Sequence, residues 1–119
     1  MNEPQPHIEF IDDRRVRLLS DFNYTLYVGQ EEYHFHIPKG FITDGASVPK
    51  IFWGFPFYFT PFQGKVMPAA VVHDFCYAHQ FQPKYLADWF LYKIMGKYGV
   101  GIFKRLAYFV AVRLGGRYK

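Results

Sequence analysis

The sequence predicts an α+β protein in which a small antiparallel β meander comes first and three helices follow. Residues 8–43 alternate apolar and polar side chains with a period of two, whereas from Pro68 onward the apolar residues recur at helical spacing. The chain has 119 residues, of which 50% are hydrophobic and 20% charged, so it can form one modest core and is not typical of disorder. We therefore expect a single domain over residues 1–119, with residues 1–7 as a flexible tail.

Three short segments in the β meander have the composition of strands. They are rich in aromatic and β-branched residues and read RVRLLS, NYTLYV and YHFHIP. Turn-forming residues separate them at 20–21, 29–31 and 38–40. The pattern therefore favours an antiparallel arrangement with tight connections.

The last of these strands carries two histidines on one face. Because side chains alternate along a strand, His34 and His36 lie opposite Tyr33, Phe35 and Ile37. The two histidines form either a metal-binding face or an ordinary polar side toward solvent. The solvent-facing interpretation is favoured.

Residues 44–64 are predicted to form a loop region. Thr, Asp, Gly, Ser and Pro crowd the stretch GFITDGASVPK, and two prolines and a glycine interrupt IFWGFPFYFTPF, which contains seven aromatic residues in twelve. The aromatic loop either packs over the core or presents a surface to a partner or a membrane interface. Its candidate partner-binding residues are Trp53, Phe55, Phe57, Tyr58 and Phe59.

The helical part, residues 65–116, divides into three helices. Pro68 and Pro83 suit first helical turns, and they predict helices over about 68–80 and 83–97. Gly99 and Gly101 separate these from a third helix over about 102–114, which ends at a pair of glycines.

Charge is distributed unevenly along the chain. Residues 1–38 contain seven acidic residues against three arginines, whereas residues 39–119 contain eleven Lys and Arg against three acidic residues, Asp44, Asp74 and Asp88. Acids that are rare in a basic region are candidates for specific roles. The basic excess itself is either a solvated face or a surface that favours phosphate-bearing partners, whether nucleic acid or lipid.

Neither a secretory signal nor a membrane span is expected. The first residues, MNEPQPHIEF, are polar and contain prolines, and the apolar run LAYFVAV is far too short to cross a bilayer. Cys76 is the one cysteine, so no intrachain disulfide is possible. This favours a reducing compartment or an assembled particle over a small secreted scaffold.

The stretch AAVVHDFCYAHQ places the main candidate site on the first helix. His73 and Tyr77 share a face because they are four residues apart, and Asp74 is rotated about 100° away. If the first two helices form an antiparallel hairpin that turns near Phe81, His73 and Asp88 lie at matching heights. A hydrogen bond between them would fix the tautomer of His73 and leave its other nitrogen free to act as a general base on water.

Two alternatives to this dyad stay open. The phase of the second helix can turn Asp88 outward, toward Lys84 at i−4. Cys76, three residues from His73, is geometrically conceivable as a nucleophile, but a buried structural cysteine is favoured. Ser47 has no nucleophile elbow around it, and the sequence contains no P-loop, GxGxxG, CxxC or HExxH motif.

Asp74 and Asp44 are candidate ligands for a hard cation such as calcium. Carboxylates together with backbone carbonyls of the 40–47 loop would supply the oxygen ligands that this ion prefers. Alternatively, Asp44 closes an Asx-type turn on Gly45 or Ala46. Asp74 then forms an ion pair with Arg113, which otherwise sits in an apolar helix.

Several motifs together resemble a family of small phage and prophage proteins that is catalogued mainly as a domain of unknown function. In order, they are DFNY, IPKGFITDGASVPKIFW, AAVVHDFCY, LADWFLYKIM and YFVAVRLGG, and they extend over about residues 18–116. The resemblance implies a phage or prophage origin. It implies recurring positions at Asp44, Gly45, Ser47, Pro49, His73, Asp74, Tyr77, Asp88 and Arg113.

HDFCY followed by ADWFLYKIM is also similar to the paired helices of phospholipases A2. That resemblance implies His73 as the base on water, Asp88 as the residue that orients it, Asp74 as a calcium ligand and Tyr77 as a support. The disulfides and the glycine-rich calcium loop of those enzymes are absent from this sequence, and the link between the helices is short.

Two functional classes follow from these observations. The first is a structural or accessory protein of a phage particle, its assembly or its host interaction, located in the virion or the host cytoplasm, with other phage proteins as partners and a lipid interface as a further option. The second is a His/Asp ester hydrolase with Ser47, Gly45 and Arg113 in support. A third class, nucleic-acid binding through the basic C-terminal helix, is not expected, because Arg113 is predicted to point inward. Its residues would be Lys104, Arg105, Arg113 and Arg117.

Overall fold

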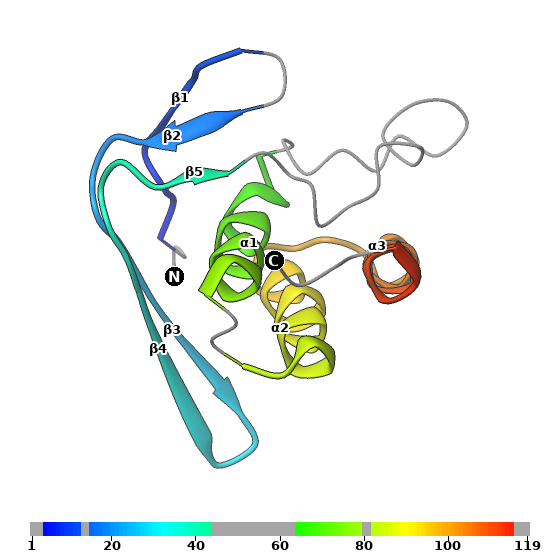
Figure 1. Ribbon diagram of the computed structural model, residues 1–119. Coiled ribbons are helices and arrows are strands. Elements are labelled where there is room, and N and C mark those ends of the chain that lie inside the picture. Colours follow the sequence, from blue (N-terminus) through cyan, green and yellow to red (C-terminus); the bar gives the residue numbers. More distant parts are fainter. Residues whose placement is uncertain (1–3, 13–14, 44–63, 80–81, 116–119) are drawn as a thin grey trace. The chain divides into compact units, whose positions relative to one another are not determined.

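A computed structural model describes residues 4–12, 15–43, 64–79 and 82–115 of the chain. The chain divides into two compact units, Met1–Asp44 and Gly45–Lys119 (Figure 1). Strands make up the regular structure of the first unit and helices that of the second. The predicted α+β class and the order of its parts are therefore confirmed.

The first unit contains two antiparallel sheets instead of one continuous meander. One has the strand order β1-β2-β5 and the other is a hairpin of β3 and β4. The bounds are β1 Ile8–Phe10, β2 Val16–Leu18, β3 Phe22–Val28, β4 Glu31–Ile37 and β5 Ile42–Thr43. The meander is interrupted because the chain turns sharply after β4. Gly40 has a φ of 91°, and the amide of Phe41 donates to the carbonyl of Pro38 at 3.1 Å, so β5 pairs with β2.

The β3–β4 hairpin has one apolar and one polar face. Cross-strand partners Tyr24 and Phe35 are buried, as are Phe22 and Ile37. On the other face, Thr25 Oγ1 lies 3.0 Å from His34 Nδ1. Such cross-strand pairs stabilise a hairpin and fix its register.

The two histidines of β4 point to solvent. His34 Nε2 lies 2.5 Å from a Glu32 carboxylate oxygen, and His36 Nδ1 lies 2.5 Å from Asn23 Oδ1. The side chains of both histidines are about two-thirds exposed, at 67% and 64%. The prediction of a solvent-facing polar side is therefore confirmed.

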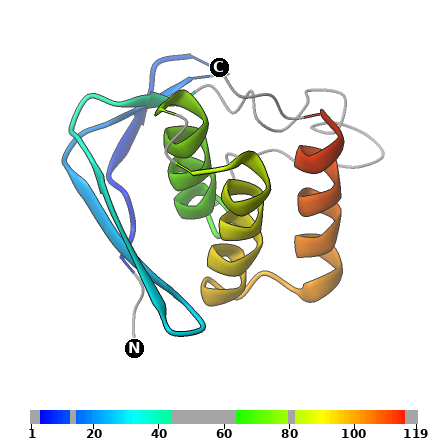
Figure 2. The same ribbon diagram turned by 60° about the horizontal axis from the view of Figure 1, so that its bottom comes forward.

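The described residues of the second unit form three helices. They are α1 Met67–His79, α2 Lys84–Lys97 and α3 Ile102–Gly115. Helix α2 packs against both α1 and α3, and the three lie side by side with α2 in the middle (Figure 2). These bounds differ from the predicted ones by at most one residue, and Pro68 occupies the first turn of α1.

Glycine ends α2 as the sequence predicts. Gly99 has a φ of 85°, a left-handed conformation that glycine adopts without steric cost. The amide of Val100 then donates to the carbonyl of Met95 at 3.0 Å, which closes the last turn of the helix. This turn redirects the chain into α3.

Burial differs greatly between the helices. Nearly all of α1 is buried, whereas α3 buries only Tyr108, Ala111 and Val112. None of the helices in the described part of the chain is long and apolar enough to cross a bilayer. Helix α1 is therefore the most deeply buried of the three helices, and α3 has one covered and one open side.

Candidate functional site

The candidate site is a buried polar cluster centred on the carboxylate of Asp88 in α2. His73 Nε2 lies 2.7 Å from Asp88 Oδ1, and the hydroxyl of Tyr77 donates to the same oxygen. The side chains of His73 and Asp88 are both 0% exposed. The predicted contact between these two residues is thus present, because α1 and α2 are antiparallel and bring them to the same height.

The second carboxylate oxygen of Asp88 accepts two cationic donors. Lys84 Nζ lies 2.9 Å from Oδ2, and Arg113 NH1 lies 3.0 Å from it. Lys84 Nζ also donates to the backbone carbonyl of Val112 at 3.0 Å. The cluster therefore joins side chains from all three helices.

Helical spacing explains most of this convergence. His73 and Tyr77 are four residues apart, and their ring centroids are 4.2 Å apart. Lys84 and Asp88 have the same spacing on α2, with Lys84 N-terminal to the acid. Lys84 Nζ also lies 5.7 Å from the centroid of the Tyr77 ring. The two i, i+4 pairs face each other across the α1–α2 interface.

The environment of Asp88 favours its ionised form. Burial of the carboxyl raises its pKa, but the hydrogen bonds from His73 and Tyr77, the charge of His73 and the hydrogen bond from Lys84 outweigh burial. Together they lower the pKa of Asp88 from its ordinary value of 3.8 to about 2. The cluster is thus built around a carboxylate that stays charged.

This lowered pKa predicts a specific acid sensitivity. A carboxyl whose pKa is lower in the folded than in the unfolded protein stabilises the fold above the unfolded pKa, and it loses that contribution as pH falls through the folded pKa. We expect about 2 kcal/mol of the free energy of unfolding to disappear between about pH 5 and pH 2. Urea unfolding of the wild type and Asp88→Asn across this range measures it.

The control for acid sensitivity is Asp12→Asn, because Asp12 forms an exposed ion pair with Arg15. This variant should keep the acid dependence of the wild type, whereas Asp88→Asn should lose the part that Asp88 contributes. An Asp88→Asn protein with the full wild-type dependence would contradict the assignment.

One buried atom of the cluster has no hydrogen-bond partner. Nδ1 of His73 is buried and unpaired in the structure of the described residues. Since Nε2 faces the Asp88 carboxylate, a neutral imidazole that donates from Nε2 carries its lone pair on Nδ1. Only in that neutral form does Nδ1 have the proton-accepting character of a general base, because the charged form carries a proton on both ring nitrogens.

Cys76 does not supply a nucleophile. The residue is fully buried, and burial raises the pKa of its thiol to about 12. A thiolate is therefore strongly disfavoured at neutral pH. The interpretation of Cys76 as a buried structural residue is confirmed.

The structure corrects one predicted pairing. Arg113 donates to Asp88 and does not form the alternative ion pair with Asp74. The reason is the position of α3, which lies beside α2 and brings the guanidinium to the acid of α2. Asp74 is 6% exposed and has other contacts.

Lys84 and the carbonyl of Val112 are members of the cluster that sequence analysis did not assign to the site. The i−4 spacing of Lys84 was a usable signal, because it identified the same pair as an alternative to the His73 contact. Any residue has a backbone carbonyl, so the hydrogen bond from Lys84 to the carbonyl of Val112 could not be predicted from residue types.

Other predicted site residues lie outside the described part of the chain. They are Asp44, Gly45, Ser47, Pro49, Trp53, Phe55, Phe57, Tyr58 and Phe59. Within residues 4–12, 15–43, 64–79 and 82–115, no three His, Cys, Asp or Glu side chains are grouped so that they can hold a metal ion. A cation site that combines Asp74 with Asp44 stays a prediction.

A comparison with known protein families identifies the family of this chain. Residues 16–112 match the family described as "Protein of unknown function (DUF1353)". The chain belongs to the DUF1353 family. No curated protein and no solved structure matches the chain.

The DUF1353 match contains most of the cluster. It includes His73, Tyr77, Lys84 and Asp88, and it ends at Val112, whose carbonyl accepts from Lys84. Arg113 is the one member of the cluster beyond the matched residues. The DUF1353 region of this chain therefore holds the α1–α2 part of the site in full.

Proposed function

We propose that this DUF1353 protein is a structural or accessory component of a phage particle, of its assembly or of its host interaction. The supporting observation is the closed state of the Asp88 cluster. Four donors from three helices converge on one carboxylate that is 0% exposed. A buried polar network whose central group is fully bonded specifies one packing arrangement.

The phage context of this proposal rests on sequence resemblance. The motifs GFITDGASVP and HDFCY occur in the order typical of small phage and prophage proteins. A protein of this kind acts through its surface, with the buried cluster holding the helices in place. Other phage proteins are the expected partners.

The experiment that tests the structural role is the stability of His73→Ala. Loss of the imidazole leaves a cavity beside Tyr77 and removes one hydrogen bond to the buried carboxylate. We expect the free energy of unfolding to fall by about 2 kcal/mol or more. Urea or thermal unfolding followed by circular dichroism measures the change.

His79→Ala is the matched control, because His79 lies on the same helix and is exposed. Its free energy of unfolding should stay within about 0.5 kcal/mol of the wild-type value. A His73→Ala protein that unfolds like His79→Ala would argue against a structural role for the cluster.

The unpaired Nδ1 of His73 favours a second candidate function, a phospholipase A2-like ester hydrolase. In that mechanism Nδ1 takes a proton from water as the water oxygen adds to the ester carbonyl, while Asp88 holds Nε2 of the ring. The tetrahedral intermediate then breaks its bond to the alcohol oxygen, which leaves with the proton from Nδ1, and the carboxylic acid is released. Asp74 and Asp44 would hold calcium near the ester. The chemistry requires an opening from solvent to Nδ1.

Turnover assays separate the two candidates. Ester and phospholipid substrates are incubated with wild type, His73→Ala and His79→Ala, with calcium or with EDTA. A hydrolase predicts turnover that His79→Ala keeps and His73→Ala loses. Equal rates in the two variants, or no turnover of any substrate, would reject the hydrolase and leave the structural proposal standing.

A further inference from the structure

Helix α3 carries an exposed apolar stripe along one side. Its members are spaced three or four residues apart, so they share one face of the helix. Their exposed fractions are 87% for Phe103, 44% for Leu106, 51% for Val110 and 79% for Leu114. Isolated exposed apolar residues are ordinary, but a continuous stripe over three turns is typical of a surface that contacts something else.

The charged side chains of α3 do not interrupt this stripe. The guanidinium of Arg105 lies over the Tyr92 ring, with its central carbon 4.5 Å from the ring centroid. Arg113 reaches Asp88 on α2. Both arginines therefore contact side chains of α2, and Lys104, the third cation of α3, lines a pocket at the start of the helix.

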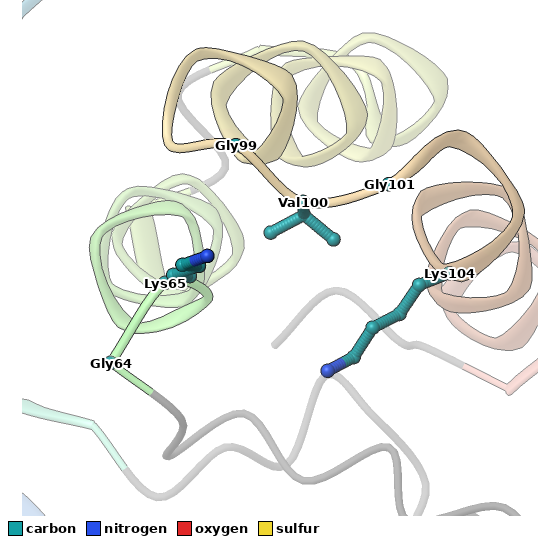
Figure 3. A pocket seen from close by; sticks show the side chains of 6 residues that line it. All are labelled: Gly64, Lys65, Gly99, Val100, Gly101 and Lys104. Atoms are coloured by element: carbon teal, nitrogen blue, oxygen red, sulfur yellow. The ribbon is translucent and has the colours of Figure 1, made fainter.

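A basic pocket of about 400 Å³ lies at the N-terminal end of the same helix. Its lining consists of Gly64, Lys65, Gly99, Val100, Gly101 and Lys104. Lys65 and Lys104 stand on opposite sides of the hollow, with Val100 between them (Figure 3). Lys104 directly follows Phe103, so the pocket adjoins the first residue of the apolar stripe.

The described surface around these features is basic. Residues 64–79 and 82–115 contain two acids, Asp74 and Asp88, and both are buried. The same residues contain seven basic side chains: Lys65, Lys84, Lys93, Lys97, Lys104, Arg105 and Arg113. In this part of the chain, no exposed carboxylate opposes the approach of an anionic surface.

We propose that α3 docks on an anionic phospholipid surface, with the apolar stripe in the acyl boundary and with Lys65 and Lys104 on a lipid phosphate. Charge decides between this occupant and a second copy of the chain. Two copies pairing through α3 would bring together two basic surfaces on which the described residues expose no carboxylate, whereas anionic lipid attracts them. An apolar helix face beside lysines is the pattern of helices that lie in the membrane interface. The inference goes beyond the proposed function and does not depend on catalysis.

Co-sedimentation of the full chain with vesicles tests this docking. Wild type is expected to bind vesicles of phosphatidylcholine with phosphatidylglycerol, and to bind vesicles of phosphatidylcholine alone much more weakly. Phe103→Ser and Leu114→Ser should each lower the partition coefficient by about tenfold. Lys104→Gln should lower it about fivefold, since a lysine near an anionic surface contributes an attraction of that size.

Tyr85→Ser is the matched control, because Tyr85 is 63% exposed on α2 and lies outside the stripe. Its binding should equal that of wild type. Equal vesicle binding by Phe103→Ser and wild type, or binding that does not depend on phosphatidylglycerol, would overturn the proposal. Saturable binding of inorganic phosphate without any vesicle binding would overturn it too, because the pocket would then serve a free ion.

Two further measurements exclude other occupants of the stripe. Light scattering should show the same molar mass for wild type and Leu114→Ser; a dimer that this substitution abolishes would assign the stripe to self-association and overturn the proposal. Thermal unfolding should be the same for both proteins. A marked loss of stability in Leu114→Ser would mean that the chain itself covers the stripe, and it would overturn the proposal as well.

Discussion

Replacing Asp88 by asparagine is expected to lower the free energy of unfolding by about 3–5 kcal/mol, because it removes one side of a buried ion cluster. Asparagine has nearly the same shape, so packing is preserved and charge is lost. Lys84 and Arg113 then lose their common anion at Oδ2. The amide also places donor hydrogens where the carboxylate accepted hydrogen bonds.

The partial exposure of the two cations sets the lower end of this range. The side chain of Lys84 is 27% exposed and that of Arg113 is 40% exposed, so both can turn toward water when the carboxylate is lost. The side chains of His73 and Tyr77 cannot turn toward water in this way, since both are buried. Most of the expected loss therefore arises at the α1–α2 interface.

Asp12→Asn, the control for acid sensitivity, is also the control for the loss of stability in Asp88→Asn. Its ion pair with Arg15, at 2.9 Å between two half-exposed side chains, is of the kind that contributes about 0–1 kcal/mol. Urea unfolding at pH 7 compares the two variants. If Asp88→Asn loses no more stability than Asp12→Asn, the cluster does not hold the helices together.

Phe90→Ala is expected to lower the free energy of unfolding by a similar amount, about 3–5 kcal/mol, for a different reason. Phe90 is 0% exposed and lies two residues from Asp88 on α2. The substitution removes apolar contacts and leaves a cavity, but it does not change the charge of the cluster. Phe103→Ala, at a residue 87% exposed, is the control and should change stability by less than about 0.5 kcal/mol.

The pH dependence of the two losses distinguishes their causes. The stability lost in Asp88→Asn should shrink as pH falls toward 2, because Asp88 of the wild type becomes protonated there. The loss in Phe90→Ala should stay nearly constant over the same range. Parallel urea titrations at several pH values measure both losses. A loss of unfolding free energy in Asp88→Asn that does not change with pH would contradict an ionic origin.

The α1–α2 part of the site could be predicted from the sequence because it depends on local geometry. Helical spacing fixes His73 relative to Tyr77 and Lys84 relative to Asp88, and a short link forces the two helices to be antiparallel. Counting residues outward from this link then places His73 and Asp88 at the same height on the two helices. The alternation of β4 likewise fixed the exposed side of the hairpin.

The remaining contacts depend on geometry that no local pattern encodes. Whether Arg113 meets Asp74 or Asp88 is decided by the side of the α1–α2 pair on which α3 lies. Strands β1 and β5 span three and two residues, which is too short for a period to be recognised, and β5 pairs with β2 across a turn. Long-range packing therefore determines both the partner of Arg113 and the pairing of β5 with β2.

The position of Asp88 between three helices also bears on how the helical unit opens. Helices at the edge of a bundle often detach in local fluctuations while the rest stays folded. Here the departure of α3 would take Arg113 and the Val112 carbonyl away from Asp88 and Lys84, and it would leave the buried carboxylate short of a cation. Fraying of α3 is thereby coupled to the α1–α2 interface, so amide protons of the three helices are expected to exchange with solvent as one cooperative unit.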